Sequence, residues 1–214
     1  MNAENADNGA VTLGTITQAS SLTVNSGGEV TQTAAATVTG AVEVNAAGQN
    51  VSLTQADNTF GSVGVTGANV EIVEADATTL RATTATGTLK VTSEGALTQN
   101  GAVSATGTST LKATAVTLGN DQNDFGGDVT IDGQVAGATI HDANALTVTA
   151  VDSTAGVDLQ VGGDLTASGD VTGTTVAMTA GGALQTQAVT ANAGNATLTG
   201  ASVTTAGAVN ATGK

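Results

Sequence analysis

The chain has 214 residues, with 29 Gly, no Pro, no Cys, no Trp, no Tyr and two Phe. Four basic residues stand against 18 acidic ones, giving a formal net charge of -14 at pH 7. That charge repels phosphate backbones and anionic surfaces, so nucleic acid is a poor partner. No apolar run reaches the length of a membrane span, so no membrane insertion is predicted. With 40% hydrophobic residues, the chain is expected to fold.

Apolar-x-apolar triplets recur along the chain and predict short strands with two inward side chains around one outward residue. In chain order they are Leu22-x-Val24, Val42-x-Val44, Val51-x-Leu53, Val63-x-Val65, Val70-x-Ile72, Leu89-x-Val91, Val116-x-Leu118, Val129-x-Ile131, Leu146-x-Val148, Leu159-x-Val161 and Val176-x-Met178. Gly, Asn, Asp and Ser separate them, as expected of turns. Strands this short do not form an independently stable sheet, but they can stack. No sustained 3.6-residue stripe predicts a helix.

Longer segments repeat as well. The stretches LTVNSGGEVTQT from Leu22, LKVTSEGALTQN from Leu89 and VAMTAGGALQTQ from Val176 share one pattern. VSLTQADNTFG from Val51 matches VTLGNDQNDFG from Val116, and each contains one of the two Phe residues. The interval from Leu89 to Val176 exceeds the interval from Leu22 to Leu89 by about 20 residues, which indicates one structural unit inserted whole.

A parallel β-solenoid accounts for such an insertion, because one more coil lengthens the stack without disturbing its neighbours. An immunoglobulin-like sandwich would need large core side chains and would not absorb the insertion in register. We therefore predict an all-β protein, a single solenoid domain over residues 1–214, with about ten coils of roughly 20–22 residues. Its repeat units are predicted at about 22–88, 89–175 with one inserted coil, and 176–214 as a partial unit.

The units NDFGGDVTIDG, DANALTVTA and SEGALTQNGAVSATGTSTLKATAVTL resemble repeats of filamentous haemagglutinin-like adhesins, large β-helical exoproteins of Gram-negative bacteria. The resemblance extends from about residue 20 to the end. It implies a right-handed parallel β-helix that is secreted or lies on the outer cell surface. It also implies that the chain is an internal piece of a longer protein, and that its partners are glycans or proteins on host or neighbouring cells.

Four aspartates within a dozen positions suggest a calcium site, because calcium prefers several carboxylate ligands. The candidate ligands are Asp121, Asp124, Asp128 and Asp132. Their spacing differs from an EF-hand loop. In the repeat alignment Asp121 and Asp124 correspond to Ala56 and Thr59, so the fold does not require acids there. The alternative interpretation is a solvated acidic corner.

What recurs at this corner is a set of three residue types. Asn58 aligns with Asn123, Phe60 with Phe125, and Gly61 with Gly126. We interpret them as a turn residue, an apolar plug and a flexible position.

No other pattern predicts a catalytic or cofactor-binding residue. His141, the single histidine, lacks the second histidine or cysteine that a zinc site needs. With few basic residues and no aromatic platform for sugar stacking, the chain is not expected to be a polysaccharide-cleaving enzyme. Thr-x-Thr triplets beginning at residues 15, 37, 147 and 197 leave most coils without one, which disfavours ice binding. Thr is an ordinary outward strand residue.

The expected function is therefore a non-enzymatic adhesin stalk, a stiff rod that mediates or presents adhesion to cells, glycans or matrix. This step rests on the resemblance rather than on an identified site. One alternative is a self-assembling extracellular fibre in which coils stack end to end. Another is a passive shaft that carries a toxin tip outside this sequence.

Overall fold

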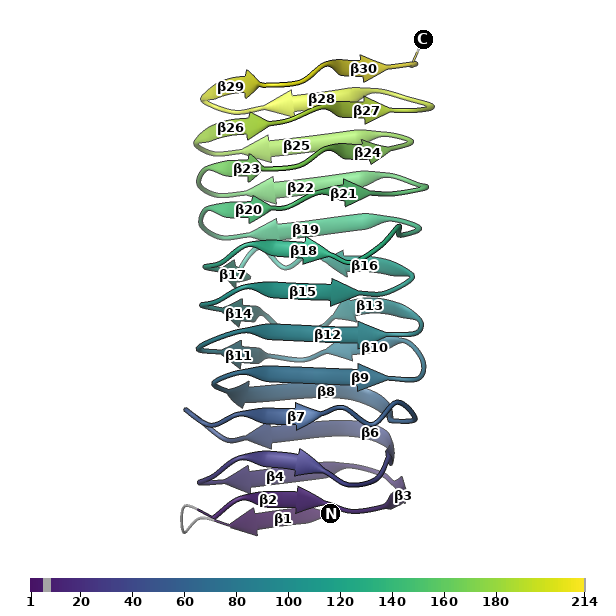
Figure 1. Ribbon diagram of the computed structural model, residues 1–214, viewed down its shortest axis with the longest axis vertical. Coiled ribbons are helices and arrows are strands. Elements are labelled where there is room, and N and C mark those ends of the chain that lie inside the picture. Colours follow the sequence, from purple (N-terminus) through teal and green to yellow (C-terminus); the bar gives the residue numbers. More distant parts are fainter. Residues whose placement is uncertain (6–8, 214) are drawn as a thin grey trace.

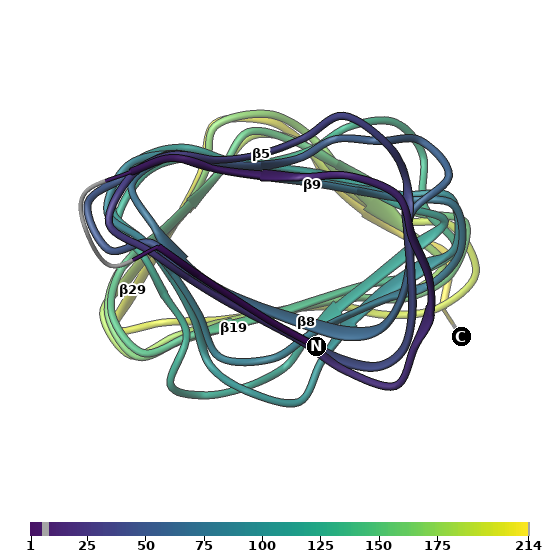
Figure 2. The same cartoon turned by 90° about the horizontal axis from the view of Figure 1, so that it is seen from below.

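The computed structural model describes residues 1–5 and 9–213. These residues form short strands and no α-helix, and paired strands run parallel. In Figure 1 the chain climbs from the N-terminus to the C-terminus as a stack of coils, and Figure 2 shows a flattened, closed outline along the axis. Successive strands run rightward along the front and leftward along the back, so the solenoid is right-handed. The predicted all-β parallel β-helix is confirmed.

Three sheets run along the solenoid. Sheet A contains 15 strands: β1 (Asn2–Asn5), β4 (Leu22–Ser26), β6 (Ala36–Asn45), β8 (Thr59–Gly67), β10 (Thr78–Leu80), β13 (Ala96–Gln99), β16 (Ala115–Leu118), β19 (Ala138–Asp142), β22 (Val157–Val161), β25 (Val176–Ala180) and β28 (Ala196–Thr199), with β3 (Ile16–Ala19), β11 (Thr83–Ala85), β14 (Val103–Ala105) and β17 (Asp124–Phe125) beside this main path. Sheet B contains 11 strands: β2 (Val11–Leu13), β5 (Val30–Gln32), β7 (Val51–Leu53), β9 (Val70–Glu74), β12 (Leu89–Ser93), β15 (Ser109–Lys112), β18 (Val129–Ile131), β20 (Leu146–Val148), β23 (Leu165–Ala167), β26 (Ala183–Thr186) and β29 (Ser202–Thr205). Sheet C contains four: β21 (Val151–Asp152), β24 (Val171–Gly173), β27 (Val189–Ala191) and β30 (Val209–Ala211).

Sheet B has one strand in each coil, so the described residues make about 11 coils. Its register pairs Val30 with Val51 and Val51 with Val70, so one coil takes about 20 residues. Most other sheet B registers step by 19 residues, as from Val70 to Leu89, so the coils are slightly shorter than predicted and there is about one more of them. At about 4.8 Å per coil, the stack is roughly 50 Å long.

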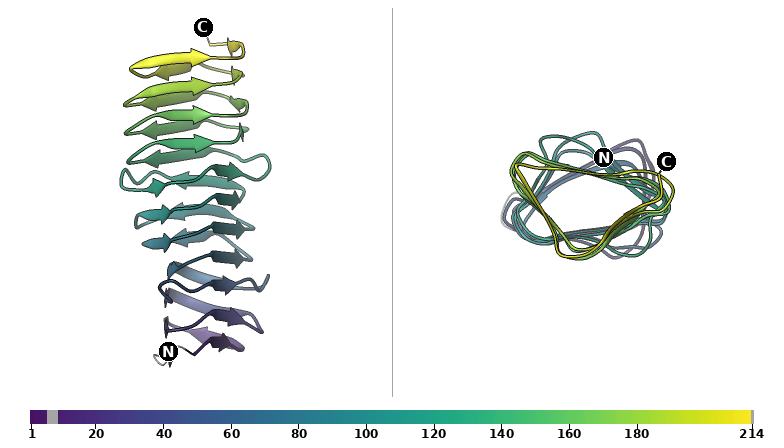
Figure 3. Two further views of the ribbon diagram at one scale, coloured as in Figure 1. Left: turned by 60° about the vertical axis from the view of Figure 1, so that its left-hand side comes forward. Right: turned by 90° about the horizontal axis from the view of Figure 1, so that it is seen from above.

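Many coils carry a third, shorter strand whose position changes along the rod. Near the N-terminus, β3 follows β2 of sheet B and precedes β4 on the main path of sheet A. In the middle, β11, β14 and β17 each follow a main-path strand of sheet A and precede a strand of sheet B. Towards the C-terminus, the strands of sheet C again follow sheet B and precede sheet A. The bulges of the coil outline in Figure 3 accordingly point in different directions at different heights.

The core is a column of inward side chains stacked coil on coil. Both apolar members of every predicted triplet are buried; Leu22 is 1% exposed and Val24 0%. Each such side chain contributes roughly 1.5–3 kcal/mol through burial. The triplet pattern missed Leu97, Leu165 and Leu184, which are equally buried. Their inward neighbours two positions on are Gln, Ala or Thr, so these strands lack a second large apolar residue.

Candidate functional site

A buried amide organises the corner between β7 and β8. Asn58 Oδ1 accepts hydrogen bonds from the side-chain amide of Gln32 at 3.0 Å and from the backbone N–H of Ala36 at 2.9 Å. Its Nδ2 donates to Gln32 Oε1 at 2.9 Å and to the carbonyl oxygens of Leu53 and Val73 at 3.3 and 3.2 Å. Asn58 has no exposed surface. This amide therefore links three successive coils, and its hydrogen-bonding capacity is fully used.

Asn123 makes the same set of bonds between β16 and β17. Its Oδ1 accepts from the Gln99 amide at 2.8 Å and from the Val103 N–H at 2.9 Å. Its Nδ2 donates to Gln99 Oε1 at 3.0 Å and to the carbonyl oxygens of Leu118 and His141 at 3.1 Å. The sequence predicted both asparagines as turn residues, and the backbone N–H of each does close a turn at 3.1 Å. Their larger role, as buried hydrogen-bonding centres, was not anticipated.

Each corner is completed by a phenylalanine and a buried carboxyl group. The N–H of Phe60 donates to Glu74 Oε1 at 2.8 Å, and the N–H of Phe125 donates to Asp142 Oδ2 at 2.7 Å. Both Phe side chains are buried, as predicted for an apolar plug. We define the first Asn–Phe corner as Gln32, Asn58, Phe60 and Glu74, and the second as Gln99, Asn123, Phe125 and Asp142.

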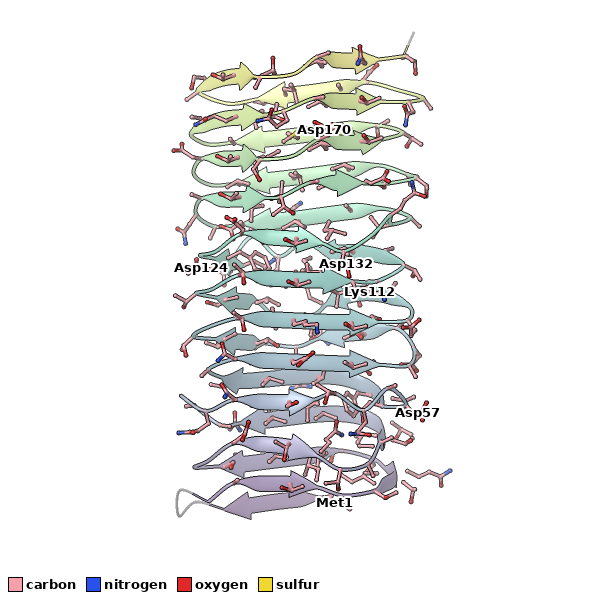
Figure 4. The ribbon with its side chains drawn as sticks, in the orientation of Figure 1. Met1, Asp57, Lys112, Asp124, Asp132 and Asp170 are labelled. Atoms are coloured by element: carbon pink, nitrogen blue, oxygen red, sulfur yellow. The ribbon has the colours of Figure 1, made fainter. Side chains whose placement is uncertain are left out.

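The two corners lie on opposite sides of the rod. The first leads from sheet B into sheet A, whereas the second leads from sheet A towards sheet B. In Figure 4, Asp57 of the first corner's loop and Asp124 of the second project on opposite sides. The aligned residues Leu22 and Leu89 lie on β4 of sheet A and β12 of sheet B, and the chain passes β6, β8 and β10 of sheet A between them. The repeated sequence thus spans three and a half coils.

Comparison with protein families gives this repeat a name. Residues 1–66 and 67–132 each match a family described as repeats of unknown function, DUF5649. The chain belongs to this family. Comparison with curated proteins and with solved structures found no match. One DUF5649 repeat therefore corresponds to three and a half coils, and the two repeats are related by a half-turn about the rod axis.

The C-terminal coils follow a different spacing. From Leu89 to Val176 the chain passes β15, β18, β20 and β23 of sheet B before it reaches β25 of sheet A, which is four and a half coils. The two intervals between the aligned segments thus differ by one coil. Residues 133–214 contain no Phe, so this part of the rod has no Asn–Phe corner.

The two buried carboxyl groups of the corners are ionisable groups that sequence reasoning missed. Glu74 is fully buried, and its Oε2 has no hydrogen-bond partner among the described residues. Burial, with a smaller contribution from the charge of Asp76, raises the pKa of Glu74 to about 7. Burial also raises the pKa of Asp142, although two backbone N–H groups oppose the shift. The sequence indicates these acids only by their position: each is the last residue of a strand in the coil that follows its asparagine.

The four predicted calcium ligands are not brought together. Asp121 lies in the loop before β17, Asp124 on β17, Asp128 just before β18 and Asp132 just after it. All four are exposed, and Figure 4 shows Asp124 at the edge of the rod and Asp132 well apart from it. Within residues 1–5 and 9–213, no group of three or more His, Cys, Asp or Glu side chains could hold a metal ion. This geometry favours the solvated acidic corner over the calcium site.

His141 is paired with an aspartate of the preceding coil. Its Nδ1 lies 2.7 Å from Asp121 Oδ1, and its Nε2 lies 3.9 Å from Asp158 Oδ2 of the following coil. The imidazole is 16% exposed, whereas Asp121 is 86% exposed. The histidine thus holds one oxygen of Asp121 in place. Among the described residues, the pair belongs to no group of three or more His, Cys, Asp or Glu side chains that could hold a metal ion.

Two shallow grooves flank the loop that carries Asp121. The larger, of about 720 Å³, lies over Thr98, Gln99 and Asn100 of one coil and is bounded by residues 117–122 of the next. The smaller, of about 320 Å³, lies between Asp121 and the strand residues Gln160 and Val161. Both are lined by hydroxyl, amide and carboxylate groups. Such groups can hydrogen-bond a polar ligand, but they supply no nucleophile activated by a neighbouring base.

The described part of the chain contains no helix long and apolar enough to cross a membrane.

Proposed function

We propose that this chain is a stiff, non-enzymatic rod of an extracellular adhesin, located outside a Gram-negative cell, that presents polar surfaces to glycans or proteins of other cells. The observation that carries the proposal is the continuous stack. Sheets A and B each run through all of the coils, with parallel hydrogen-bonded ladders between neighbouring coils. A structure in which each coil contacts mainly its neighbours is suited to holding a shape over distance rather than to enclosing a substrate.

Its outer surface supports the same proposal. Outward positions are mainly Thr, Ser, Asn, Gln and Asp, and Thr hydroxyls bond between coils, as between Thr79 and Thr98 at 3.1 Å. Two basic residues are paired with acids, Lys90 with Glu71 at 2.7 Å and Arg81 with Glu43 at 3.5 Å. Apart from Lys112 and the apolar side chains exposed at the ends of the rod, the rest of the described surface is mainly acidic or uncharged-polar. Such a surface favours polar neutral partners over nucleic acid or anionic lipid.

The adhesive part of the proposal can be tested on intact cells. The purified, fluorescently labelled chain should be monomeric by light scattering, roughly 50 Å long by small-angle X-ray scattering, and should attach to cells in a saturable way. An excess of unlabelled chain should displace it. A folded monomer that attaches to no cell type would contradict adhesion by this segment. Concentration-dependent filaments would instead favour the extracellular fibre.

A further inference from the structure

At the larger groove beside residues 119–122, the two DUF5649 repeats differ in hydrogen bonding while sharing the buried corner. In the first repeat, several of the equivalent side chains use their polar groups internally. Ser52 Oγ lies 3.4 Å from Thr54 Oγ1, and Thr33 Oγ1 donates to the Leu13 carbonyl at 3.3 Å. Gln55 Nε2 donates to the Gln32 carbonyl at 3.4 Å. This face of the first repeat is therefore largely self-satisfied.

In the second repeat the positions of Thr33 and Ser52 carry side chains without an internal hydrogen bond, and that of Thr54 carries no side chain. Asn100 replaces Thr33, Thr117 replaces Ser52 and Gly119 replaces Thr54. Within the described residues, the side chains of Asn100, Thr117 and Gln122 make no hydrogen bond. Gly119 leaves the space over Thr139 open, since a Cβ there would meet only a methyl group at 3.5 Å. The groove that results has unengaged donors and acceptors and a volume of about 720 Å³, which is within the range of small-molecule sites.

The walls of this groove are held rigidly. Asn123, directly after the loop, is fixed by five hydrogen bonds, and two of these bonds hold the side-chain amide of Gln99 in the groove floor. Asn120 Oδ1 accepts the backbone N–H of Gln122 at 2.9 Å, which orders the loop itself. His141 holds one oxygen of Asp121 and leaves the other available. Little backbone conformational entropy of the loop is then lost when a ligand binds.

The chemistry of the lining selects the ligand class. It offers amides, hydroxyls and one carboxylate, with no Lys or Arg among the lining residues. An anionic ligand would be repelled by Asp121 and by the overall charge of -14. An apolar ligand would leave the polar groups unpaired. A neutral polyol satisfies both donors and acceptors, because each sugar hydroxyl can donate and accept.

We propose that the groove formed by Thr98, Asn100, Thr117, Asn120, Asp121 and Gln122 is a binding subsite for neutral carbohydrate, present in the second DUF5649 repeat and lacking in the first. This inference builds on the proposed adhesive function and assigns it a place. The absence of an aromatic stacking surface among the lining residues makes a single site weak. Several such repeats along a longer rod would raise the overall avidity.

The test is a nuclear magnetic resonance titration of the ¹⁵N-labelled chain with neutral oligosaccharides of glucose, galactose, mannose and N-acetylglucosamine. Sialylated and sulfated oligosaccharides serve as anionic controls. At least one neutral probe should shift the backbone amides of residues 98–100 and 117–122, and leave those of residues 31–33 and 52–57 unchanged. Equal shifts in both repeats, preference for an anionic probe, or no shift at the groove with any probe would overturn the proposal.

Matched variants sharpen the test. Asn100→Thr combined with Asp121→Ala gives the second repeat the residues of the first at both positions, and should weaken binding roughly tenfold or more. The control Asp57→Ala, in the equivalent loop of the first repeat, should leave binding unchanged. Both variants must retain the melting curve of the parent chain. If the first variant still attached to cells, the proposed sugar site would be wrong but the adhesive function would remain supported. If the parent chain bound sugar but attached to no cells, the sugar site would be supported and the adhesive function contradicted.

Discussion

The first and second Asn–Phe corners share a buried frame and differ in the loop they hold. Each frame consists of a hydrogen-bonded Gln–Asn amide pair, a buried Phe and a carboxyl group that accepts the Phe N–H. The corresponding hydrogen bonds are between 2.7 and 3.3 Å long. The loop that precedes the asparagine consists of residues 54–57 at the first corner and of residues 119–122 at the second. Variation is thus concentrated where side chains face solvent. The comparison separates what the fold requires from what a binding surface can use.

The half-turn between the two repeats determines the side of the rod on which each loop is presented. Because one DUF5649 repeat occupies three and a half coils, equivalent loops of the two repeats face opposite sides of the rod. A third repeat of the same length would return the loop to the first side, seven coils or roughly 34 Å further on. The inserted coil in residues 89–175 changes that spacing.

The largest expected effect is loss of either aromatic plug. Phe60→Ala and Phe125→Ala should each lower the free energy of unfolding by about 3–5 kcal/mol, because each leaves a cavity in a rigid stack. Chemical denaturation followed by circular dichroism measures the change. A large effect at one corner and a negligible effect at the other would show that the two frames are not equivalent.

Loss of the buried amide should cost somewhat less. Asn58→Leu and Asn123→Leu each remove the buried hydrogen bonds to a backbone N–H, two carbonyls and a glutamine amide, which predicts a loss of about 3 kcal/mol. The same denaturation experiment applies. Double variants with Gln32→Leu or Gln99→Leu should be less destabilised than the sum of the single changes, since the partner amide is removed as well.

The two buried carboxyl groups should distinguish the corners by pH. The folded-state pKa of Glu74 is about 7, above its ordinary 4.5, so the folded chain keeps a proton that the unfolded chain releases in this window. The stability that Glu74 contributes is therefore fully present below pH 4.5 and falls as the pH rises through 7, by about 3 kcal/mol in all. Asp142 shifts in the same direction.

Glu74→Gln should flatten the pH dependence of unfolding between pH 4.5 and about 7, and Asp142→Asn should flatten it less. Denaturant melts at several pH values test this order. If Glu74→Gln left the slope unchanged, Glu74 would be ionised in the folded state throughout this range.

The smallest effects are expected in the exposed loops. Asp57→Asn and Asp121→Asn should each change stability by no more than about 0.5 kcal/mol, because neither carboxylate supports the buried frame. Thermal melts of both variants provide the measurement. A much larger loss for Asp121→Asn would mean that its contact with His141 belongs to the frame and not to the loop.

Much of this fold could be predicted from sequence because each coil repeats a simple physical requirement. Pairs such as Leu22 and Val24 alternate inward, and insertion of one whole coil is compatible only with a stack. The third strands were missed because β11, β14 and β17 bury Ala and Phe rather than two large aliphatic residues. The half-turn was also missed, although its signal was available. The interval from Leu22 to Leu89 is not a whole multiple of a coil of about 20 residues.

The candidate site was harder to predict than the fold. The acids at 121–132 drew attention because they are clustered in sequence, but a coil carries neighbouring residues to different faces. The acids that are buried, Glu74 and Asp142, lie alone in their segments and meet Phe60 and Phe125 only through stacking of successive coils. Sequence proximity is a poor guide to spatial proximity in a solenoid, where most contacts join residues one coil apart.

The most direct test of the half-turn is a distance between the two loops. The chain has no cysteine, so spin labels can be placed at the equivalent exposed positions Asp57→Cys and Gln122→Cys without further changes. The two corners are separated across the rod by most of the length of a strand such as β8, and along the rod by three and a half coils. Together these two components predict a separation of roughly 30 Å by double electron–electron resonance. Glu71→Cys on β9 with Thr149→Cys directly after β20, four coils further on, is the same-side control at roughly 19 Å. A loop-to-loop distance of roughly 17 Å, the rise of three and a half coils alone, would place both loops on one side and contradict the account.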